Sequence, residues 1–311
     1  MISFSDIPIS GFQDILNRAS KFKLMIKRGK RFHSLDGKIV GLLFEKPSTR
    51  TSTSFEAATI RLGGTPLYLS ESEMQMKRGE PVKDTARVLG GYLNAIVARV
   101  FAHDTVVQLA KYSGLPTVNA LSDIEHPTQL VSDMLTIYEI KGHIRGVNIA
   151  YIGDGNNVAN SLLLAAAVGG ANAAIACPKG YEPDAGILSK AEAIAKRTGS
   201  KISITHDVKA AAAGADVLYT DVWVSMGQEA ETKRRLKAFR GYQINQKVVR
   251  FAAEDAIVMH CLPAHRGLEI TDEVIEGRRS AVWQQAENKL YGAAAVLDTV
   301  INGPKGKRRA K

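Results

Sequence analysis

The sequence predicts an α/β protein of two domains, each a parallel β-sheet flanked by helices. Its 311 residues exceed one typical domain, and roughly 150 residues per domain favours two. Short apolar runs alternate with longer amphipathic segments, as in βαβ units, and this alternation starts again near residue 147. Ligands of parallel sheets bind beyond the carboxyl ends of the strands, so we expect the functional site in the cleft between the domains.

Four apolar runs predict the strands of the first domain, which we expect to cover residues 1–140. The helix after the first run, at 52–62, is indicated by Phe55, Ala58 and Leu62, which share one face at helical spacing. A longer pattern predicts a connecting helix at 127–139, and the glycine-containing turn at 141–146 marks the domain boundary. The four runs are 39–44, 66–69, 95–100 and 117–119.

A second series of five apolar runs predicts the strands of the second domain, at 147–284. These runs are 147–152, 173–177, 202–205, 217–220 and 257–260. A last helix, about 285–301, comes late enough in the chain to pack back on the first domain. Residues 303–311 form a basic tail.

The composition argues against several classes of protein. Hydrophobic residues make up 45% and charged residues 23%, which is ordinary for a soluble globular protein. The start of the chain does not resemble a secretory leader, and no apolar stretch reaches the roughly 18 residues of a membrane span, so we expect a cytoplasmic protein. Cys177 and Cys261 are the only cysteines, and they lack the spacing of a disulfide framework or a zinc site.

The formal charge of +10 (41 − 31) would suit either a polyanion or small anionic substrates. Five of the last seven residues are Lys or Arg, so half of the excess charge lies in the tail. No aromatic platform is interleaved with basic residues. We therefore expect no nucleic acid as the main partner.

The run Ser48-Thr49-Arg50-Thr51 lies between the first predicted strand and the helix that follows it. Pro47 ends the strand, and the free N–H groups of a helix N-terminus favour a bound anion. Arg50 can add a bidentate, charged donor. The run therefore predicts a phosphate site, although a hydroxyl cluster before a helix, taken alone, is more often an ordinary Ser/Thr helix cap.

A glycine-containing turn, Gly153-Asp154-Gly155-Asn156-Asn157, follows the first strand of the second domain. It is similar to the start of a dinucleotide-binding loop, but Val158 stands where the third glycine would be. The turn can still bring an Asn side chain to a small ligand. A strand-to-helix turn without any ligand is the alternative.

Three further segments carry polar side chains near the ends of predicted strands. His126 and Gln129 begin a helix, where an imidazole can donate to a carbonyl and an amide can bind an NH₂ group. Asp221 and Ser225 share a loop that suits the charged ends of an amino acid. Backbone carbonyls of the segment 260–263 can accept from an amine. Each segment also has an ordinary explanation, as a turn, a packed loop or a buried cysteine.

Together these motifs resemble, in order and spacing, the signatures of the ornithine carbamoyltransferases over nearly the whole chain. Ser-Thr-Arg-Thr at 48–51 and His-Pro-Thr-Gln at 126–129 are shared with aspartate carbamoyltransferases and indicate carbamoyl phosphate. Ser-Met-Gly at 225–227 and His-Cys-Leu-Pro at 260–263 are the ornithine-type forms. The resemblance implies carbamoyl transfer from carbamoyl phosphate to the side-chain amine of L-ornithine, giving L-citrulline and phosphate. It also implies a trimer that needs no metal or redox cofactor.

The resemblance implies roles for individual residues as well. The phosphate would be bound by Ser48, Thr49, Arg50, Thr51 and Arg99, with Gln75 reaching the phosphate site of a neighbouring subunit. The carbamoyl group would be bound by His126, Gln129, Cys261, Leu262 and Lys289. The amino-acid end of ornithine would be bound by Asn157, Asp221, Ser225 and Met226. The catalytic residues would be Arg50, Arg99, His126, Asp221 and Cys261.

The chain departs from the family pattern at Glu287-Asn288-Lys289, where the family usually has Glu-Asn-Arg. Lys289 keeps the positive charge but lacks the planar fork of a guanidinium. We therefore expect weaker binding of carbamoyl phosphate, or a shifted contact, with activity retained.

Three alternatives stay open at this point. Another carbamoyltransferase would act on putrescine or an N-acylated ornithine, but putrescine lacks the carboxylate and α-amine that Asp221, Ser225 and Asn157 suit. A nucleotide-dependent oxidoreductase would rely on the turn at Gly153, which Val158 disfavours. An RNA-binding module would rely on the basic tail. The sequence also leaves open whether the enzyme works in arginine synthesis or in the reverse direction.

Overall fold

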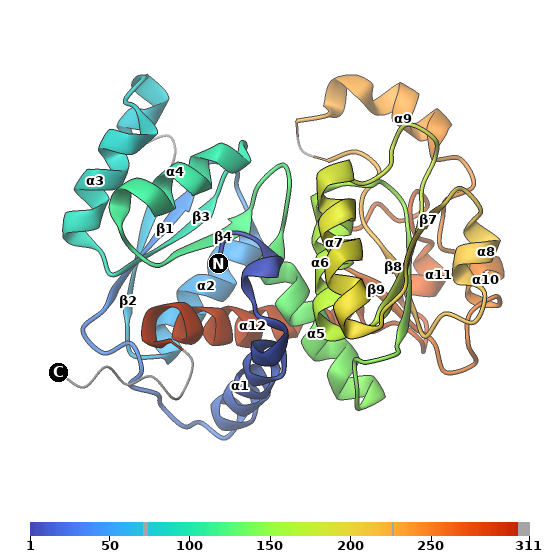
Figure 1. Cartoon of the computed structure of the whole chain (residues 1–311), viewed down its shortest axis with the longest axis horizontal. Coiled ribbons are helices and arrows are strands. Elements are labelled where there is room, and N and C mark those ends of the chain that lie inside the picture. The colour runs from blue at the N-terminus through green and yellow to red at the C-terminus, as the bar shows by residue number, and fades with distance from the viewer. Residues whose placement is uncertain (71–73, 226, 304–311) are drawn as a thin grey trace. The chain divides into compact units, whose positions relative to one another are not determined.

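The computed structural model describes residues 1–70, 74–225 and 227–303 and contains two compact units. Unit 1 comprises Met1–Leu135 together with Asn288–Lys311, and unit 2 comprises Thr136–Glu287 (Figure 1). The division falls within helix α5 (Pro127–Lys141), earlier than the turn at 141–146. The two halves of this helix therefore belong to different cores.

Unit 1 is built on a sheet of four parallel strands in the order β2-β1-β3-β4. The strands are β1 (Ile39–Phe44), β2 (Thr65–Ser70), β3 (Ala95–Arg99) and β4 (Thr117–Leu121). All four predicted strands are confirmed, with bounds that differ by at most two residues. Strand β1 lies inside the sheet and is buried from its second residue to its last, which explains its unbroken apolar sequence.

Helices cover both faces of this sheet. Figure 1 shows α3 (Val82–Tyr92) and α4 (His103–Ser113) on one side, where their apolar residues form a buried cluster with Leu43, Ile96 and Ala98. The other helices of unit 1 are α1 (Ile9–Lys27), α2 (Thr49–Arg61) and the larger part of α12 (Val282–Asn302). Helices α1 and α12 are joined by an ion pair of Arg18 with Asp298, and Lys23 Nζ donates to Asn288 Oδ1 at 2.8 Å.

Unit 2 is built on five parallel strands in the order β7-β6-β5-β8-β9. The strands are β5 (Asn148–Ile152), β6 (Asn172–Ala176), β7 (Ile202–Thr205), β8 (Val217–Thr220) and β9 (Ile257–His260). The helices are α6 (Asn157–Gly169), α7 (Ala185–Thr198), α8 (Val208–Ala212), α9 (Thr232–Ala238), α10 (Gln246–Val249) and α11 (Asp272–Ile275). A buried cluster joins the strands to α8, α10 and α11.

The strand orders explain where polar loops gather in each unit. The direction of winding reverses between β1 and β3 in unit 1, and between β5 and β8 in unit 2. Parallel sheets bind ligands at such reversal points, beyond the carboxyl ends of the strands. Residues 48–51 follow β1 at the start of α2, and Arg99 is the last residue of β3. In unit 2, Asn157 follows β5 as the first residue of α6, and Asp221 directly follows β8.

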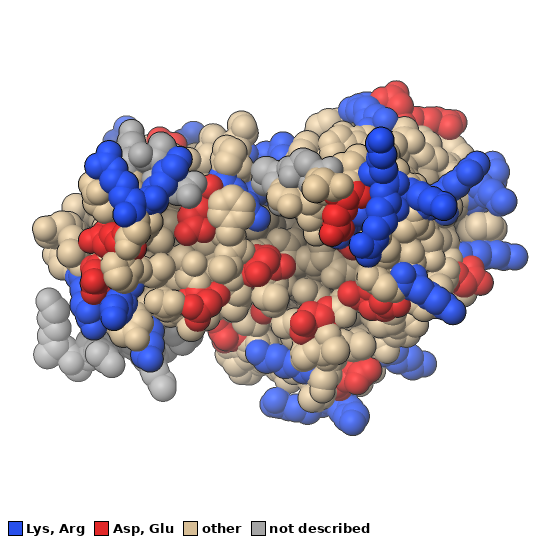
Figure 2. Space-filling model, turned by 90° about the horizontal axis from the view of Figure 1, so that it is seen from above, with Lys and Arg blue, Asp and Glu red and all other residues tan. Residues whose placement is uncertain are grey.

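Two properties of the described residues concern partners. None of their helices is both long and apolar enough to cross a bilayer. On the face shown in Figure 2, Lys and Arg side chains alternate with Asp and Glu instead of forming one continuous basic surface.

Candidate active site

The N-terminus of α2 forms the predicted phosphate cradle. Ser48 is the helix cap, and its Oγ accepts from the N–H of Thr51 at 3.2 Å. The helix starts at Thr49, three residues before the predicted start at residue 52, because capping residues are polar and carry no periodic signal. The remaining N–H groups of the first turn have no intrahelical acceptors and suit an anion. Thr51 is buried and Arg50 is half-buried.

A small, tightly packed pocket lies beside this helix end, entirely within unit 1. Thr51 contributes to it from α2, Thr128 from α5 and Lys289 from α12. Its other lining residues are Ser54, Phe55, Ser132 and Ala293. The structure therefore brings the Thr51 cradle and Lys289 together, although they are far apart in the sequence.

Lys289 and Gln129 are joined inside unit 1 by a buried hydrogen bond from Nζ to Oε1. Gln129 Nε2 in turn donates to Asp133 Oδ1 at 2.8 Å, one turn later on α5. A lysine only donates and a carboxylate only accepts, so the amide of Gln129 has one possible orientation. Its oxygen faces Lys289 and its nitrogen faces Asp133.

His126 lies immediately before α5 and is buried. Burial, with the charges of Lys289 and Arg99, lowers the pKa of His126 well below its ordinary value of 6.5. Arg99, at the end of β3, is buried as well. The imidazole is therefore neutral at physiological pH, and one of its nitrogens carries a proton to donate.

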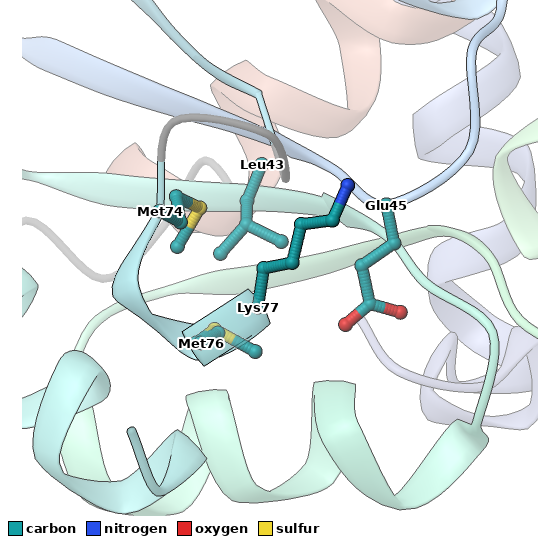
Figure 3. Close-up of a pocket in the computed structure, with 5 residues that line it drawn as sticks. All are labelled: Leu43, Glu45, Met74, Met76 and Lys77. Atoms are coloured by element: carbon teal, nitrogen blue, oxygen red, sulfur yellow. The ribbon is translucent and has the colours of Figure 1, made fainter. Parts of the chain in front are cut away.

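Gln75 is the predicted site residue that stands apart in unit 1. It is exposed at the start of the short helix η3 (Gln75–Arg78), and no hydrogen bond among the described residues links its side chain to the other predicted residues. Its neighbours Met74, Met76 and Lys77 line a second pocket of about 90 Å³ with Leu43 and Glu45 (Figure 3). Glu45 Oε2 accepts from the N–H of Phe101 at 2.7 Å, which fixes the polar wall of that pocket.

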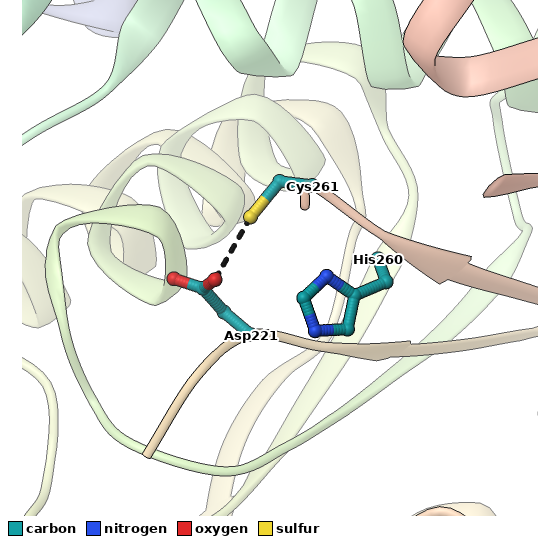
Figure 4. Close-up of side chains that lie close together, drawn as sticks. All are labelled: Asp221, His260 and Cys261. Atoms are coloured by element: carbon teal, nitrogen blue, oxygen red, sulfur yellow. Dashed lines mark hydrogen bonds between the residues drawn. The ribbon is translucent and has the colours of Figure 1, made fainter. Parts of the chain in front are cut away.

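Asp221 is the centre of the polar cluster in unit 2. It is buried after β8, and its Oδ1 accepts from Cys261 Sγ at 3.0 Å (Figure 4). Its Oδ2 accepts from Asn156 Nδ2 at 2.8 Å. Asn156 caps α6 by accepting from the N–H groups of Val158 and Ala159, so its amide nitrogen is the group that faces Asp221. The carboxylate keeps further lone pairs for a cationic ligand.

His260 lies close enough to Asp221 and Cys261 for the three side chains to share a metal ion. However, His260 Nδ1 accepts from the N–H of Leu262 at 2.8 Å, and Nε2 is 3.0 Å from Glu269 Oε1. Both ring nitrogens are therefore engaged within the protein. The histidine fits a structural role better than that of a metal ligand.

Leu262 adopts a left-handed backbone conformation with φ of 59°. Such a conformation costs a non-glycine residue on the order of 1–3 kcal/mol. The bond to His260 and the packing of the Leu262 side chain on the buried cluster of unit 2 offset this cost. The carbonyl groups of Cys261 and Leu262 are thus held in one orientation at the end of β9.

The remaining predicted residues of unit 2 are less enclosed. Asn157 is the first residue of α6 and is half-buried. Ser225 is half-buried, and its N–H donates to Gln228 Oε1 at 3.1 Å. Met226 lies outside the described residues.

Several residues of the two clusters were missed from the sequence. Asp133 lies four residues after Gln129 on one helix, and this spacing was a usable signal. The contact of Asn156 with Asp221, and a buried pair of Asp154 with Arg235, join residues far apart in the chain and left no local signal.

Comparisons with known proteins match both units. Residues 1–139 match the family model "Aspartate/ornithine carbamoyltransferase, carbamoyl-P binding domain", and residues 145–300 match the "Asp/Orn binding domain" of the same family. The anabolic ornithine carbamoyltransferase of Pyrococcus furiosus is 48% identical over 98% of this chain and 97% of its own. The ornithine carbamoyltransferase of Gloeobacter violaceus is 50% identical over 97% of this chain and 96% of its own.

Solved structures agree with this assignment. The ornithine carbamoyltransferase of Pyrococcus furiosus superimposes with a TM-score of 0.94 at 48% identity, covering 98% of this chain and 97% of that one. The anabolic enzyme of Campylobacter jejuni superimposes with a TM-score of 0.91 at 39% identity, covering 98% and 99%. The chain therefore belongs to the aspartate/ornithine carbamoyltransferase family.

Proposed function

We propose that this protein transfers the carbamoyl group of carbamoyl phosphate to the side-chain amine of L-ornithine, giving L-citrulline and phosphate. The observation that carries the proposal is the buried hydrogen bond from Lys289 to Gln129, beside the pocket that Lys289 lines together with Thr51 of α2. This pocket offers cationic and polar groups for a small phosphate ester that ends in an amide. The names of the most similar relatives support ornithine as the acceptor.

The phosphate is bound at the first turn of α2. Thr49 and Arg50 supply backbone N–H groups, Arg50 and Thr51 supply side-chain donors, and Arg99 adds a second guanidinium. Negative charge grows on the phosphate as the bond from its bridging oxygen to the carbamoyl carbon breaks. Preorganised cations near that oxygen stabilise the transition state more strongly than they stabilise the bound substrate.

The carbamoyl group is recognised by His126 and Gln129. Neutral His126 donates to the carbonyl oxygen and continues to donate as that oxygen becomes negative in the tetrahedral intermediate. Gln129 has its oxygen directed away from Asp133, so it can accept from the carbamoyl NH₂ group. Lys289 competes for that oxygen in the unliganded protein, and we infer that it moves to the substrate on binding.

The amine of ornithine must attack in its neutral form. With a pKa near 10.4, about one molecule in a thousand is neutral at pH 7.4. The nitrogen lone pair forms the new bond to the carbamoyl carbon, the phosphate leaves with the bonding electrons, and the amine loses one proton. Asp221 and Cys261 lie together at the end of parallel strands, where they can hold the substrate amines. The kcat/KM for total ornithine should therefore rise with pH through neutrality, and a flat profile would contradict selection of the neutral amine.

The test is to incubate the protein with carbamoyl phosphate and one acceptor at a time: ornithine, putrescine, N-acetylornithine or aspartate. We expect a ureido product and stoichiometric phosphate with ornithine only. Asp221→Asn keeps the shape of the side chain and removes its charge, and it should abolish most of this activity. A ureido product from another amine would refute the assignment of the acceptor, and no product from any acceptor would refute the reaction.

We further propose that the active assembly is a homotrimer in which Gln75 completes the phosphate site of a neighbouring subunit. Unit 1 carries an exposed apolar surface suited to a second copy of the chain. On the edge strand β2, Leu67 and Tyr68 are exposed, and on α3, Val88 and Tyr92 are exposed, by 45–71%. Large apolar side chains gathered on one unit commonly mark a protein interface.

The test of the trimer combines mass measurement with complementation. Light scattering should give three times the chain mass of 33.6 kDa. Gln75→Ala and Arg50→Ala should each be inactive, whereas refolding them together should restore activity, because a mixed trimer contains sites with both native residues. A monomer, or a mixture that stays inactive, would refute the shared site. A trimeric Gln75→Ala variant with full activity would refute the role of Gln75.

We also propose that the protein works in a reducing compartment, the cytoplasm. Both cysteines are free, and Cys261 has to remain a thiol in order to donate to Asp221. Mild oxidation that blocks Cys261 should lower activity, and a reductant should restore it. Unchanged activity after complete oxidation of Cys261 would count against this reasoning.

A further inference from the structure

Arg235 is a buried cation away from the residues assigned above to substrate binding. It lies on α9, and its side chain is 8% exposed. Nη1 donates to Asp154 Oδ2 at 2.9 Å and to the carbonyl of Trp223 at 3.1 Å. Nε donates to Glu231 Oε2 at 3.1 Å. One guanidinium thus joins three segments that are distant in the chain.

Two of these segments belong to the proposed ornithine site. Asp154 lies in the turn after β5, two residues before Asn156, which donates to Asp221. Trp223 lies two residues after Asp221, on the loop that leads to Ser225. The Arg235 guanidinium therefore fixes the distance between the turn and the loop that carry the amino-acid-binding groups.

The surroundings of Arg235 hold it in one conformation. Its guanidinium carbon lies 5.2 Å from the centre of the Tyr181 ring, and the Trp223 ring stacks on Phe239 at 5.8 Å. The turn that bears Asp154 is equally confined. A Cβ atom added at Gly155 would lie 2.3 Å from backbone atoms of the segment 182–183, so the turn packs directly on that backbone.

A buried ion pair is weak evidence for a role in stability alone. Removing two charges from water costs several kcal/mol per ion, and apolar replacements of buried pairs are often neutral or stabilising. The charges of Asp154 and Arg235 are better explained by a role in positioning, because their ion pair joins the turn after β5 to the loop after β8. Nη1 makes the bonds to the carboxylate and to the Trp223 carbonyl, while Nε binds Glu231, so the planar guanidinium holds Nη1 in a fixed direction that a flexible lysine lacks.

We propose that Arg235 is a positioning residue for the amino-acid substrate, holding the loop 221–225 against the turn 154–157 through Asp154 and the Trp223 carbonyl. This inference rests on the proposed function, because it concerns the ornithine side of the reaction. Arg235 touches no substrate. It acts through Asp221 and the neighbouring polar groups, whose spacing it sets.

The test compares three variants with the native enzyme. Arg235→Gln removes the charge and should raise the KM for ornithine by at least about tenfold, the loss expected for a charge-assisted hydrogen bond. Arg235→Lys keeps the charge and should raise this KM less than Arg235→Gln does. The KM for carbamoyl phosphate, and kcat at saturating ornithine, should change little. Glu231→Gln is the matched control, because it removes only the half-exposed partner and should leave both KM values within about twofold.

Binding of 2-aminopentanoate, which has the ornithine backbone but no side-chain amine, provides a readout that needs no turnover. Calorimetry in the presence of carbamoyl phosphate should show the same loss of affinity in Arg235→Gln. An unchanged KM for ornithine in Arg235→Gln would overturn the inference. A parallel rise of both KM values with a lowered Tm would also overturn it, in favour of a purely structural pair. If the native enzyme makes no citrulline, the proposed function itself fails, and this outcome is distinct from the other two.

Discussion

Replacing Lys289 by arginine tests how this chain binds the carbamoyl group with a lysine. Lys289 is 8% exposed, donates to Gln129 and lines the pocket beside Thr51. An arginine can keep one N–H on the Gln129 oxygen and direct a second toward Thr51, which lines the same pocket as Lys289. We therefore expect Lys289→Arg to lower the KM for carbamoyl phosphate.

The size of the effect is bounded by a single hydrogen bond. A charge-assisted bond contributes about 1.5–3 kcal/mol, and part of this is lost in ordering the longer side chain. A decrease in KM of up to about tenfold is the expected range, since a factor of ten corresponds to about 1.4 kcal/mol. Lys289→Met is the opposite control. It removes the charge and should raise the KM for carbamoyl phosphate by about tenfold or more.

The assay measures initial rates as a function of the carbamoyl phosphate concentration at saturating ornithine. A pH titration followed by NMR measures the pKa of the His126 imidazole in the same variants. Burial and two cations lower the pKa of His126. Lys289→Met removes one of these cations and should move that pKa back toward its ordinary value. An unchanged or raised KM in Lys289→Arg would refute the idea that lysine is the weaker ligand here. A native KM in Lys289→Met would refute any contact of Lys289 with the substrate.

Variants at three other residues probe local features. Ser48→Ala removes the cap of α2 and should lower the free energy of unfolding in urea by about 1 kcal/mol, whereas Ser48→Asp, which can also cap, should not. Burial raises the pKa of Asp154 from 3.8 to about 6. The carboxyl group therefore binds its proton more tightly in the folded state than in the unfolded state, and protonation stabilises the fold at low pH. This contribution to the free energy of unfolding is lost as the pH rises through about 6. The difference in unfolding free energy between the native protein and Asp154→Asn should therefore fall by up to about 3 kcal/mol from pH 4 to pH 7, and a difference independent of pH would contradict the shift. Cys261→Ser keeps a donor for Asp221 and Cys261→Ala does not, so the KM for ornithine should rise more in the alanine variant, by about tenfold.

The strands inside the sheets could be predicted because parallel strands covered on both faces are almost continuously apolar, whereas the partly buried edge strand β7 alternates Ile with Ser and Thr. The predicted bounds of β1, β7, β8 and β9 agree with the structure at both ends. The start of α2 could not be predicted from spacing, because Thr49 to Thr51 are polar residues of the first turn. The division of α5 between two cores could not be predicted either, because the helix is buried along most of its length and its hydrophobic pattern does not change at the division.

The composition of the candidate site was predictable only from the motifs and the resemblance they carry. Single residues such as His126 or Asp221 had ordinary explanations, and their chemistry became specific through order and spacing. Contacts such as Lys289 with Gln129, or Arg235 with Asp154, join positions 160 and 81 residues apart. No local pattern encodes such contacts, because they depend on how whole elements pack.

Unit 1 is made of two separate segments of the chain, and this has a consequence for protein synthesis. This unit consists of Met1–Leu135 and a segment that begins at Asn288, so all of unit 2 is translated between its two parts. The segment from Thr136 to Glu287 has 152 residues (287 − 136 + 1). At a translation rate of about 5–20 residues per second, its synthesis takes on the order of ten seconds. During that interval α1 lacks the helix that supplies Asn288 and Asp298. The nascent chain therefore exposes apolar surface that only its last helix can cover, and this surface is a site for chaperones and for aggregation during translation.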